Sequence, residues 1–436
     1  MDAKRFDTIC LRDSISWLPD EVLGSILSLL PTKQAASTAL LSKKWRYVFR
    51  LVDNLDFDDS VSMHVGNDKL AFPESFENFV DRTLSLQCDS PIKKFSLKVS
   101  SYDERQKACV CRWISNVASR GVLEADLRIQ DMGTFTLPPQ LFVSKTLVKL
   151  TLGAQLYLEN LPSYVLLPSL KFLFIDSVYF QYGDLCGVLL AGCPVLEELS
   201  VHHKGSLPMP HTISSPSVKR LSVDYDSLDL DGCDFMSLDL PKLVYLDYSH
   251  FALAEYRQVN LEHLVEAKMD LHPTDMVKTP DVTDLILGIR NVEILHLSPV
   301  SADVIYSYCR YKLPVFDNLV NLSLGIRNKR GWKLLAYLLK QAPKLETLIV
   351  QVLNGFTSDV SMPLNKVKAL HIPSYRGTAE ELKQLKSFLG EFECLEWVQV
   401  DVAEAAEDDS ITLQTKRDLI MPLAVSLPSK CYFKVT

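Results

Sequence analysis

The chain has 436 residues, of which 70 are leucine and only 16 are glycine. Its hydrophobic content of 47 %, beside 23 % charged residues, is enough to build a large core and excludes general disorder, a collagen-like chain and a low-complexity chain. The net charge of −8 argues against nucleic acids and membrane surfaces as main partners, because both are polyanions.

No targeting or membrane segment is predicted. Residues 1–13 mix charges with isolated apolar residues and lack the apolar core of a secretory signal, and no uncharged run is long enough to span a bilayer. The 10 cysteines are spread from Cys10 to Cys431, far more sparsely than in disulfide-stapled domains. We therefore expect reduced thiols, no metal site and no cofactor, in a protein of the nucleus or cytoplasm.

The first predicted element is a helix of about eleven residues that begins at Leu18-Pro19 and ends at Pro31. Asp20 and Glu21 stand at its positive end, where carboxylates are favourable. Its apolar residues form two stripes, Leu18, Val22, Ile26 and Leu29 on one side and Leu23, Leu27 and Leu30 on another. Because together they cover more than one core contact requires, a second surface is expected to cover this helix.

Two more short helices are expected, one from Lys33 to Leu41 after an N-cap at Thr32 and one around Trp45 after an N-cap at Ser42. Three short helices within roughly 40 residues give too small a core to be stable alone. The helical module is therefore expected to need a partner.

The runs at 18–21, 30–33 and 41–46 closely resemble the F-box, in the form common in plant F-box proteins that carry leucine-rich repeats. The resemblance spans residues 13–59 and implies docking to the Skp-type adaptor of a cullin-RING ubiquitin ligase. It also implies that seven residues build or contact that interface: Leu18, Pro19, Ile26, Leu27, Leu30, Pro31 and Trp45. Ala39 and Phe49 depart from the family pattern. The alternative is an ordinary helical cap on a larger core.

Residues 60–90 are predicted to be a connector with a helix from Pro73 to Leu86. From Ile92 onward one pattern recurs: an aliphatic residue, two others, an apolar residue, one other and an apolar residue. Its first positions are Ile92, Val122, Leu147, Leu170, Leu196, Val218, Leu243, Leu264, Val292, Leu319, Leu345, Val367 and Leu395. A mean spacing of about 25 residues is typical of leucine-rich repeats, in which each unit adds one strand to a parallel sheet.

The predicted fold class is therefore α/β: a three-helix F-box, then an irregular leucine-rich-repeat solenoid over residues 91–377, with parallel strands on the inner face and helices or loops outside. Helices are expected at Gly183–Ala191 and Trp332–Gln341. No repeat carries the asparagine that regular repeats place three positions after the third apolar residue. A continuous asparagine ladder is therefore not expected.

Residues 378–436 begin with an amphipathic helix marked by Leu382, Leu385, Phe388 and Leu389. A solvated acidic loop at 404–409, a helix over 415–427 and a strand from Cys431 to Val435 are expected to follow. This layout resembles the FBD region of such proteins, which would cap the solenoid.

Catalytic motifs are missing from the sequence. It contains no glycine-rich phosphate loop, nucleophile elbow or zinc-protease helix. His202 and His203 are neighbours on a predicted strand and would point to opposite faces, so they are poor joint metal ligands. The aspartates between Asp224 and Asp234 lack the spacing of an EF-hand. We expect a protein that is not an enzyme.

The leading hypothesis is a substrate receptor of a Skp–cullin–F-box (SCF) ubiquitin ligase, with the repeats holding an unknown target protein. Two alternatives remain open, a leucine-rich-repeat binding scaffold that never enters a ligase and a small-molecule (hormone) co-receptor. Residues that project from the strands form a candidate target surface, unless they are merely solvated: Tyr245, Asp247, Glu266, Lys268 and His296.

Overall fold

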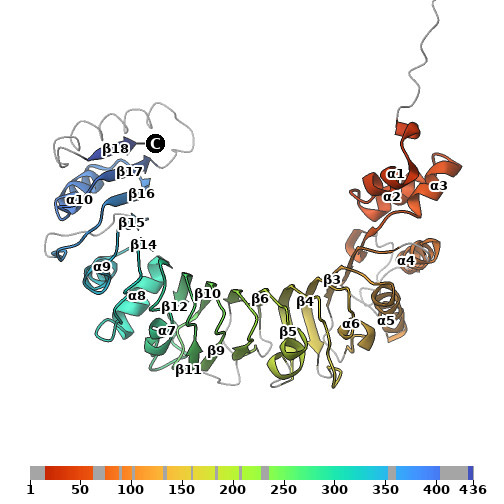
Figure 1. The fold of residues 1–436 in the computed structure, drawn as a ribbon, viewed down its shortest axis with the longest axis horizontal. Coiled ribbons are helices and arrows are strands. Elements are labelled where there is room, and N and C mark those ends of the chain that lie inside the picture. The colour runs from red at the N-terminus through yellow and green to blue at the C-terminus, as the bar shows by residue number, and fades with distance from the viewer. Residues whose placement is uncertain are drawn as a thin grey trace, which may run out of the picture. The chain divides into compact units, whose positions relative to one another are not determined.

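The structure is a computed structural model that describes residues 15–61, 74–87, 91–100, 104–130, 135–158, 161–181, 185–205, 209–226, 235–351, 360–402 and 431–435. The chain divides into two compact units. Unit 1 comprises Met1–Gln181 with Gly192–Pro194, and unit 2 comprises Tyr182–Ala191 with Val195–Thr436. Figure 1 labels many of the elements of both units.

Unit 1 begins with a 3₁₀ turn, Ile15–Trp17, and three short helices, α1 (Asp20–Leu27), α2 (Thr32–Thr38) and α3 (Lys43–Phe49). The predicted three-helix module is confirmed, although α1 ends at Leu27 and residues 28–30 form a turn. The N-cap prediction for Ser42 is confirmed, since its hydroxyl accepts a 3.4 Å hydrogen bond from the Trp45 amide. The N-cap prediction for Thr32 is wrong, because Thr32 is the first residue of α2 and Pro31 precedes it.

The sheet of unit 1 contains β1 (Asn54–Asp58), β2 (Lys94–Val99), β3 (Glu124–Ile129), β4 (Lys149–Leu158) and β5 (Phe172–Phe180). Neighbours pair in parallel and in chain order. The connections hold a 3₁₀ turn (Asp59–Val61), α4 (Glu74–Leu86), α5 (Glu104–Ser119) and α6 (Pro139–Phe142). Helix α4 is the predicted connector helix, and α5 was not predicted.

The main sheet of unit 2 is also parallel. Its strands, in order across the sheet, are β6 (Glu198–His203), β8 (Arg220–Tyr225), β10 (Tyr245–Phe251), β12 (Glu266–His272), β13 (Ile294–Leu297), β14 (Asn321–Leu324), β15 (Thr347–Val350), β16 (Ala369–Tyr375), β17 (Trp397–Val402) and β18 (Tyr432–Val435). The predicted repeat strands are therefore present. Their alternate apolar residues are buried, as a sheet with one covered face requires.

The covered face of this sheet meets two kinds of element. Between β6 and β12 the connections contribute a second, 3-stranded parallel sheet of β7 (Thr212–Ser214), β9 (Phe235–Asp239) and β11 (Glu255–Asn260). Beyond β12 they contribute helices α7 (Thr283–Gly288), α8 (Pro299–Tyr308), α9 (Lys329–Gln341) and α10 (Ala379–Leu389). The fold is thus an α/β leucine-rich-repeat solenoid after N-terminal helices.

Two sequence predictions in unit 2 need correction or completion. The segment predicted as a helix at Gly183–Ala191 is helical from Leu185 onward, although as a short π-helix, Leu185–Leu189, followed by a 3₁₀ turn, Leu190–Gly192, rather than as an α-helix. The final strand is present as β18, and α10 buries Leu385, Phe388 and Leu389 as expected. The acidic loop at 404–409 and the helix at 415–427 lie outside the described residues.

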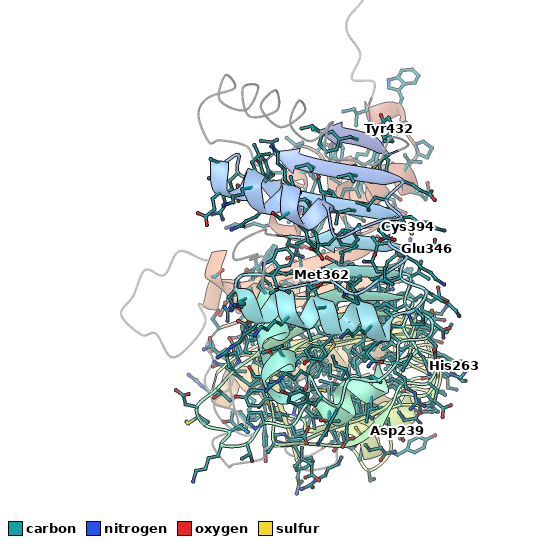
Figure 2. The ribbon with its side chains drawn as sticks, turned by 90° about the vertical axis from the view of Figure 1, so that its left-hand side faces the viewer. Asp239, His263, Glu346, Met362, Cys394 and Tyr432 are labelled. Carbon is teal, nitrogen blue, oxygen red and sulfur yellow. The ribbon has the colours of Figure 1, made fainter. Side chains whose placement is uncertain are left out.

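One edge of unit 2 is formed where the chain enters successive strands. Figure 2 shows His263, Glu346, Cys394 and Tyr432 along this edge, ahead of or at the start of β12, β15, β17 and β18. Short polar contacts tie adjacent repeats there, such as the 2.8 Å ion pair between Lys368 and Glu346. The regular entry point keeps the exposed strand residues in register across the sheet.

Candidate functional site

Helix α1 buries one of its predicted apolar stripes and exposes the other. Leu23 and Leu27 are buried in the helical module, whereas Ile26 is 43 % exposed and Leu29 is 82 % exposed. The exposed row, called here the α1 stripe, consists of Leu18, Val22, Ile26 and Leu29, together with Leu30, which was predicted in the other stripe but is 38 % exposed. A continuous apolar row facing water marks a surface that a partner covers.

The buried side of α1 is held by close packing on the segment after α3. Gly24 sits so near this segment that a Cβ atom on it would lie 2.7 Å from the Cβ of Leu51. The hydroxyl of Ser28 accepts a 3.1 Å hydrogen bond from the Asp53 amide. The orientation of the α1 stripe is therefore fixed relative to the first strand of unit 1.

A part-buried hydrogen-bonded pair connects α2 to β1. The backbone amide and the hydroxyl of Thr32 both donate to one Asp56 carboxylate oxygen, at 2.6 and 2.9 Å, and the Asp56 amide donates to the Thr32 hydroxyl at 2.7 Å. Gln87 at the end of α4 adds two bonds, to the carbonyls of Phe49 and Val52. The helical module is thus tied rigidly to the rest of unit 1.

The seven residues that the F-box resemblance assigned to the adaptor interface differ in how far they are buried. Leu18, Pro19, Ile26, Leu30 and Pro31 are exposed, Trp45 is half-buried and Leu27 lies in the core. Leu27 is therefore placed to support the surface from beneath. Further exposed apolar residues were not among the seven: Trp17, Val22, Leu29, Leu40, Leu41 and Tyr47. Val22 and Leu29 belong to the stripe that helical periodicity already indicated.

Positive charge lies beside this apolar surface on α3. Lys43, Arg46 and Arg50 are exposed, while Lys44 forms a 3.4 Å ion pair with Asp20 of α1. Exposed cations around an apolar patch favour an acidic partner surface, because complementary charge steers association.

A second candidate surface is the exposed face of β8, β10, β12 and β13 in unit 2. The strand register places Tyr245 beside Glu266, and Asp247 beside Lys268, which in turn lies beside His296. The five residues predicted from strand phase therefore form one contiguous block. Arg220 of β8 also belongs to it, and the same phase applied to the repeat at Val218 would have found it.

Tyr245 is the centre of this block. The Arg220 guanidinium lies 3.9 Å from its ring centroid and the Lys268 ammonium lies 5.4 Å from it. A hydrogen bond to Tyr245 raises the pKa of Lys268. An aromatic ring held between two cations is a rigid contact element of the kind enriched in protein interfaces.

His296 completes the block at its β13 side. Its Nε2 lies 3.6 Å from a Glu266 carboxylate oxygen, yet partial burial lowers the pKa of His296 and outweighs the attraction of that carboxylate. The contact at neutral pH is therefore made by a neutral imidazole. The block carries both charge signs, since Asp247 and Glu266 lie among its cations.

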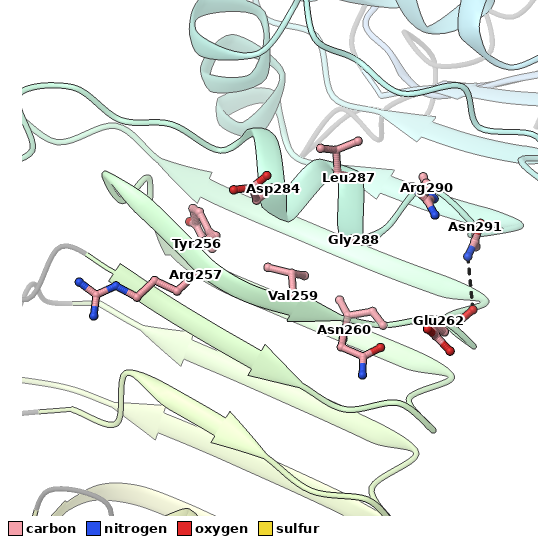
Figure 3. A pocket seen from close by; sticks show the side chains of 11 residues that line it. Tyr256, Arg257, Val259, Asn260, Glu262, Asp284, Leu287, Gly288, Arg290 and Asn291 are labelled. Carbon is pink, nitrogen blue, oxygen red and sulfur yellow. Dashed lines mark hydrogen bonds between the residues drawn. The ribbon is translucent and has the colours of Figure 1, made fainter.

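Unit 2 also contains a polar hollow of about 440 Å³ between β11 and α7. Figure 3 shows Asp284 and Leu287 on the α7 side, facing Val259 and Asn260 of β11. The amide of Asn291 donates to the Glu262 carbonyl at 3.4 Å and closes one end. Arg257 is held by Glu255 at 2.8 Å, so the two cations of the lining, Arg257 and Arg290, do not form a paired anion clamp.

The predictions on metal-binding residues concern unit 2 as well. On β6, His203 is buried and His202 is half-buried, which confirms that their rings point to opposite faces. Within the described ranges, no three His, Cys, Asp or Glu residues are grouped as metal ligands would be. Asp229, Asp231 and Asp234 lie outside those ranges.

Among the helices of the part of the chain that the structure describes, none combines the length and the apolar content that crossing a bilayer requires.

Comparison with known proteins gives two family matches and a set of close relatives. Residues 15–57 match the sequence model of the F-box domain, and residues 110–263 match that of the leucine-rich repeats of FBD-associated F-box protein At5g56370. From Arabidopsis thaliana, F-box/LRR-repeat protein At3g60040 is 69 % identical and covers 100 % of both chains. F-box/LRR-repeat protein At1g06630 is 60 % identical over 92 % of this chain and 100 % of its own.

Proposed function

The chain belongs to the F-box/LRR-repeat family, and from this premise we propose that it is the substrate-recognition subunit of an SCF-type ubiquitin ligase. The α1 stripe and its surroundings dock a Skp-type adaptor, and through it a cullin. The block around Tyr245 binds the target protein. Ubiquitination and proteasomal degradation of the target then follow in the nucleus or cytoplasm.

The observation that carries the proposal is the apolar surface on α1 to α3, held rigidly on a leucine-rich-repeat fold. The protein supplies proximity rather than a nucleophile. Holding a target beside a ubiquitin-charged enzyme raises the effective concentration of the target's lysines, so no catalytic group is needed in this chain.

A charge placed on the α1 stripe tests adaptor docking. We expect Ile26→Glu to weaken binding to a Skp-type adaptor at least tenfold, because burying an unpaired carboxylate in an apolar interface costs more than about 1.4 kcal/mol. The double variant Leu18→Ala/Pro19→Ala should act in the same direction through lost contact area. Affinities are measured by calorimetry or by quantitative pull-down with the purified adaptor.

Val244→Glu is the matched control, because Val244 in unit 2 is 43 % exposed, as Ile26 is, and the substitution is chemically the same. It should leave adaptor binding unchanged. Equal recovery of the adaptor with wild type and with Ile26→Glu would refute the proposal. Equal loss of adaptor binding in both variants would show that the introduced glutamate damages the protein in general rather than the docking surface.

Co-purification of a cullin separates the ligase from a scaffold that never enters one. We expect a cullin to be recovered with the full-length wild type and lost with Ile26→Glu. Recovery of the adaptor without any cullin would favour the scaffold. A rise in melting temperature with a candidate hormone would instead support the co-receptor function.

A further inference from the structure

Positive charge is concentrated in one part of unit 2. Between Asp303 and Lys344 the sequence holds eight lysine or arginine residues and two aspartates, in a chain whose net charge is −8. This segment contains most of α8 and all of α9. A local excess of cations in an acidic protein needs an explanation beyond solubility.

Helix α9 presents a row of cations and a tyrosine on its outer side. Its inner side buries Trp332, Leu335 and Leu339. The outer row follows the three- and four-residue spacing of one helix face and consists of Arg330, Lys333, Tyr337 and Lys340. Arg330, Lys333 and Lys340 are exposed, and Tyr337 is half-buried.

The end of α8 continues this row. The Arg310 guanidinium lies 4.9 Å from the ring centroid of Tyr306 and 4.4 Å from that of Tyr311. It also donates to the carbonyls of Tyr306 and Ser307, at 2.9 and 3.2 Å. The Tyr306 and Tyr337 rings lie 6.5 Å apart and join the two helices. Tyr311 is 80 % exposed, so the array faces solvent.

Two nearby carboxylates are already engaged. Asp303 pairs with Arg327 at 2.8 Å, and Asp281 pairs with Lys312 at 3.6 Å. In the parts of the chain that the structure describes, no carboxylate pairs with Arg310, Arg330, Lys333 or Lys340. We name the basic–tyrosine surface by its members: Tyr306, Arg310, Tyr311, Arg330, Lys333, Tyr337 and Lys340.

We propose that the basic–tyrosine surface docks an acidic protein segment that also carries apolar side chains. The unpaired cations complement carboxylates, and Tyr311 supplies exposed apolar area beside them. Arginine and tyrosine are the residues enriched in protein interfaces. This surface lies on the helical side of unit 2, whereas the block around Tyr245 lies on the exposed sheet face. The proposal is therefore independent of the function assigned to that block and to the α1 stripe.

A protein segment fits this surface better than a nucleic acid does. The row on α9 spans ten residue steps, about 15 Å, which is short for tracking a phosphate backbone. The Arg310 guanidinium occupies one face each of Tyr306 and Tyr311, so these rings are not fully open platforms for stacking bases. The net charge of −8 opposes close approach of a long polyanion.

The test uses a fluorescein-labelled peptide of Glu-Glu-Leu repeats and the full-length chain purified with its adaptor. Fluorescence anisotropy should show binding that weakens as salt rises. We expect Arg330→Glu/Lys333→Glu to weaken it at least tenfold. We expect Tyr311→Ala to reduce the preference for this peptide over poly-glutamate, because the tyrosine contacts the leucines.

Lys219→Glu/Lys242→Glu is the control, since both lysines are exposed, lie in the turns before β8 and β10 rather than on α8 or α9, and undergo the same charge reversal. It should leave the peptide affinity unchanged. An equal loss in both double variants, or no measurable binding of the peptide, would overturn the proposal. Tighter binding of duplex DNA or of anionic vesicles at the same residues would overturn it in favour of that polyanion.

Discussion

Three ring side chains, His203, Tyr225 and His250, form a buried row across β6, β8 and β10. Their ring centroids lie 6.1 and 5.0 Å apart along the row. They stand one residue before the position that regular repeats give to asparagine. Burial lowers the pKa of His250 to about 3, and nearby His211 adds to the effect. Ring side chains thus fill this part of the core without an asparagine ladder.

This burial predicts a stability that depends on pH. Unfolded His250 takes up a proton below its ordinary pKa of 6.5, whereas folded His250 stays neutral down to about 3. The unfolded state therefore binds more protons in this window, and the free energy of unfolding falls as the pH drops through it, by up to about 1.4 kcal/mol per pH unit. His250→Leu should reduce that slope, as measured by urea unfolding at pH 7, 6 and 5.

His263→Leu serves as the comparison, because His263 is exposed at the edge of the sheet. A larger change in slope for His250→Leu than for His263→Leu would assign the pH dependence to the buried ring. If His250→Leu keeps the wild-type slope, then His250 is not the group that titrates.

The sequence predicted some of the candidate surfaces more completely than others. Helical periodicity separated the two stripes of α1, but it did not indicate which stripe is exposed, since that depends on the position of the segment around Leu51. Strand phase predicted five members of the block around Tyr245 and overlooked Arg220. The basic–tyrosine surface was not predicted, because it joins residues from two helices whose packing side is decided by tertiary contacts.

At the scale of elements, repeat length decides what covers the sheet in unit 2. Repeats that start at Leu196, Val218 and Leu243 are 22, 25 and 21 residues long and contribute β7, β9 and β11. Repeats that start at Leu264, Val292 and Leu319 are 28, 27 and 26 residues long and contribute α7, α8 and α9. In a short repeat, few residues connect one strand of the main sheet to the next. They cross this distance in an extended conformation, because a helix rises only about 1.5 Å per residue and would not reach. Repeat length in the sequence therefore distinguishes the two kinds of cover.

The link between α2 and β1 makes a prediction at the element scale. Thr32→Val keeps the shape of the side chain but removes its hydroxyl, which leaves the Asp56 amide without its 2.7 Å partner. Leaving a part-buried amide unpaired costs about 1–3 kcal/mol. We expect the free energy of unfolding of unit 1 to fall by that amount, as measured by urea denaturation.

Thr38→Val is the control for this substitution. The Thr38 hydroxyl only donates to the Ala35 carbonyl within α2, at 2.7 Å, so its loss should change stability by a few tenths of a kcal/mol. Equal effects of Thr32→Val and Thr38→Val would show that the Thr32–Asp56 link does not stabilise the helical module.

At the scale of the whole molecule, the proposed functions lie on surfaces that belong to different units. The α1 stripe is in unit 1, whereas the block around Tyr245 is in unit 2. Repeat periodicity predicted the solenoid, because each repeat buries its own alternate residues against its neighbours. The 3-stranded sheet was not predicted. In β11 only Tyr256 is buried, and the strand does not show the alternation of buried and exposed residues that would mark it in the sequence.

Because the two surfaces are separate, we predict that a substitution in one surface removes the partners of that surface and leaves the partners of the other. We expect Ile26→Glu to lose the adaptor and cullin but retain target proteins, and Lys268→Glu to show the reverse pattern. Lys268→Glu replaces the cation beside Tyr245 with an anion that lies next to Asp247 and Glu266, so it inverts the local charge without touching the core. Proximity labelling with degradation blocked, read by quantitative mass spectrometry, measures both sets together.

Lys242→Glu controls for the charge change, because Lys242 is exposed in the turn before β10 and outside the block. It should retain both partner sets. Proteins that are retained with Ile26→Glu and lost with Lys268→Glu are then the targets, because their capture depends on the sheet face and not on the α1 stripe. If every protein lost with Lys268→Glu is also lost with Lys242→Glu, the block around Tyr245 is not the target surface, and the remaining exposed strand face of unit 2 becomes the next region to vary.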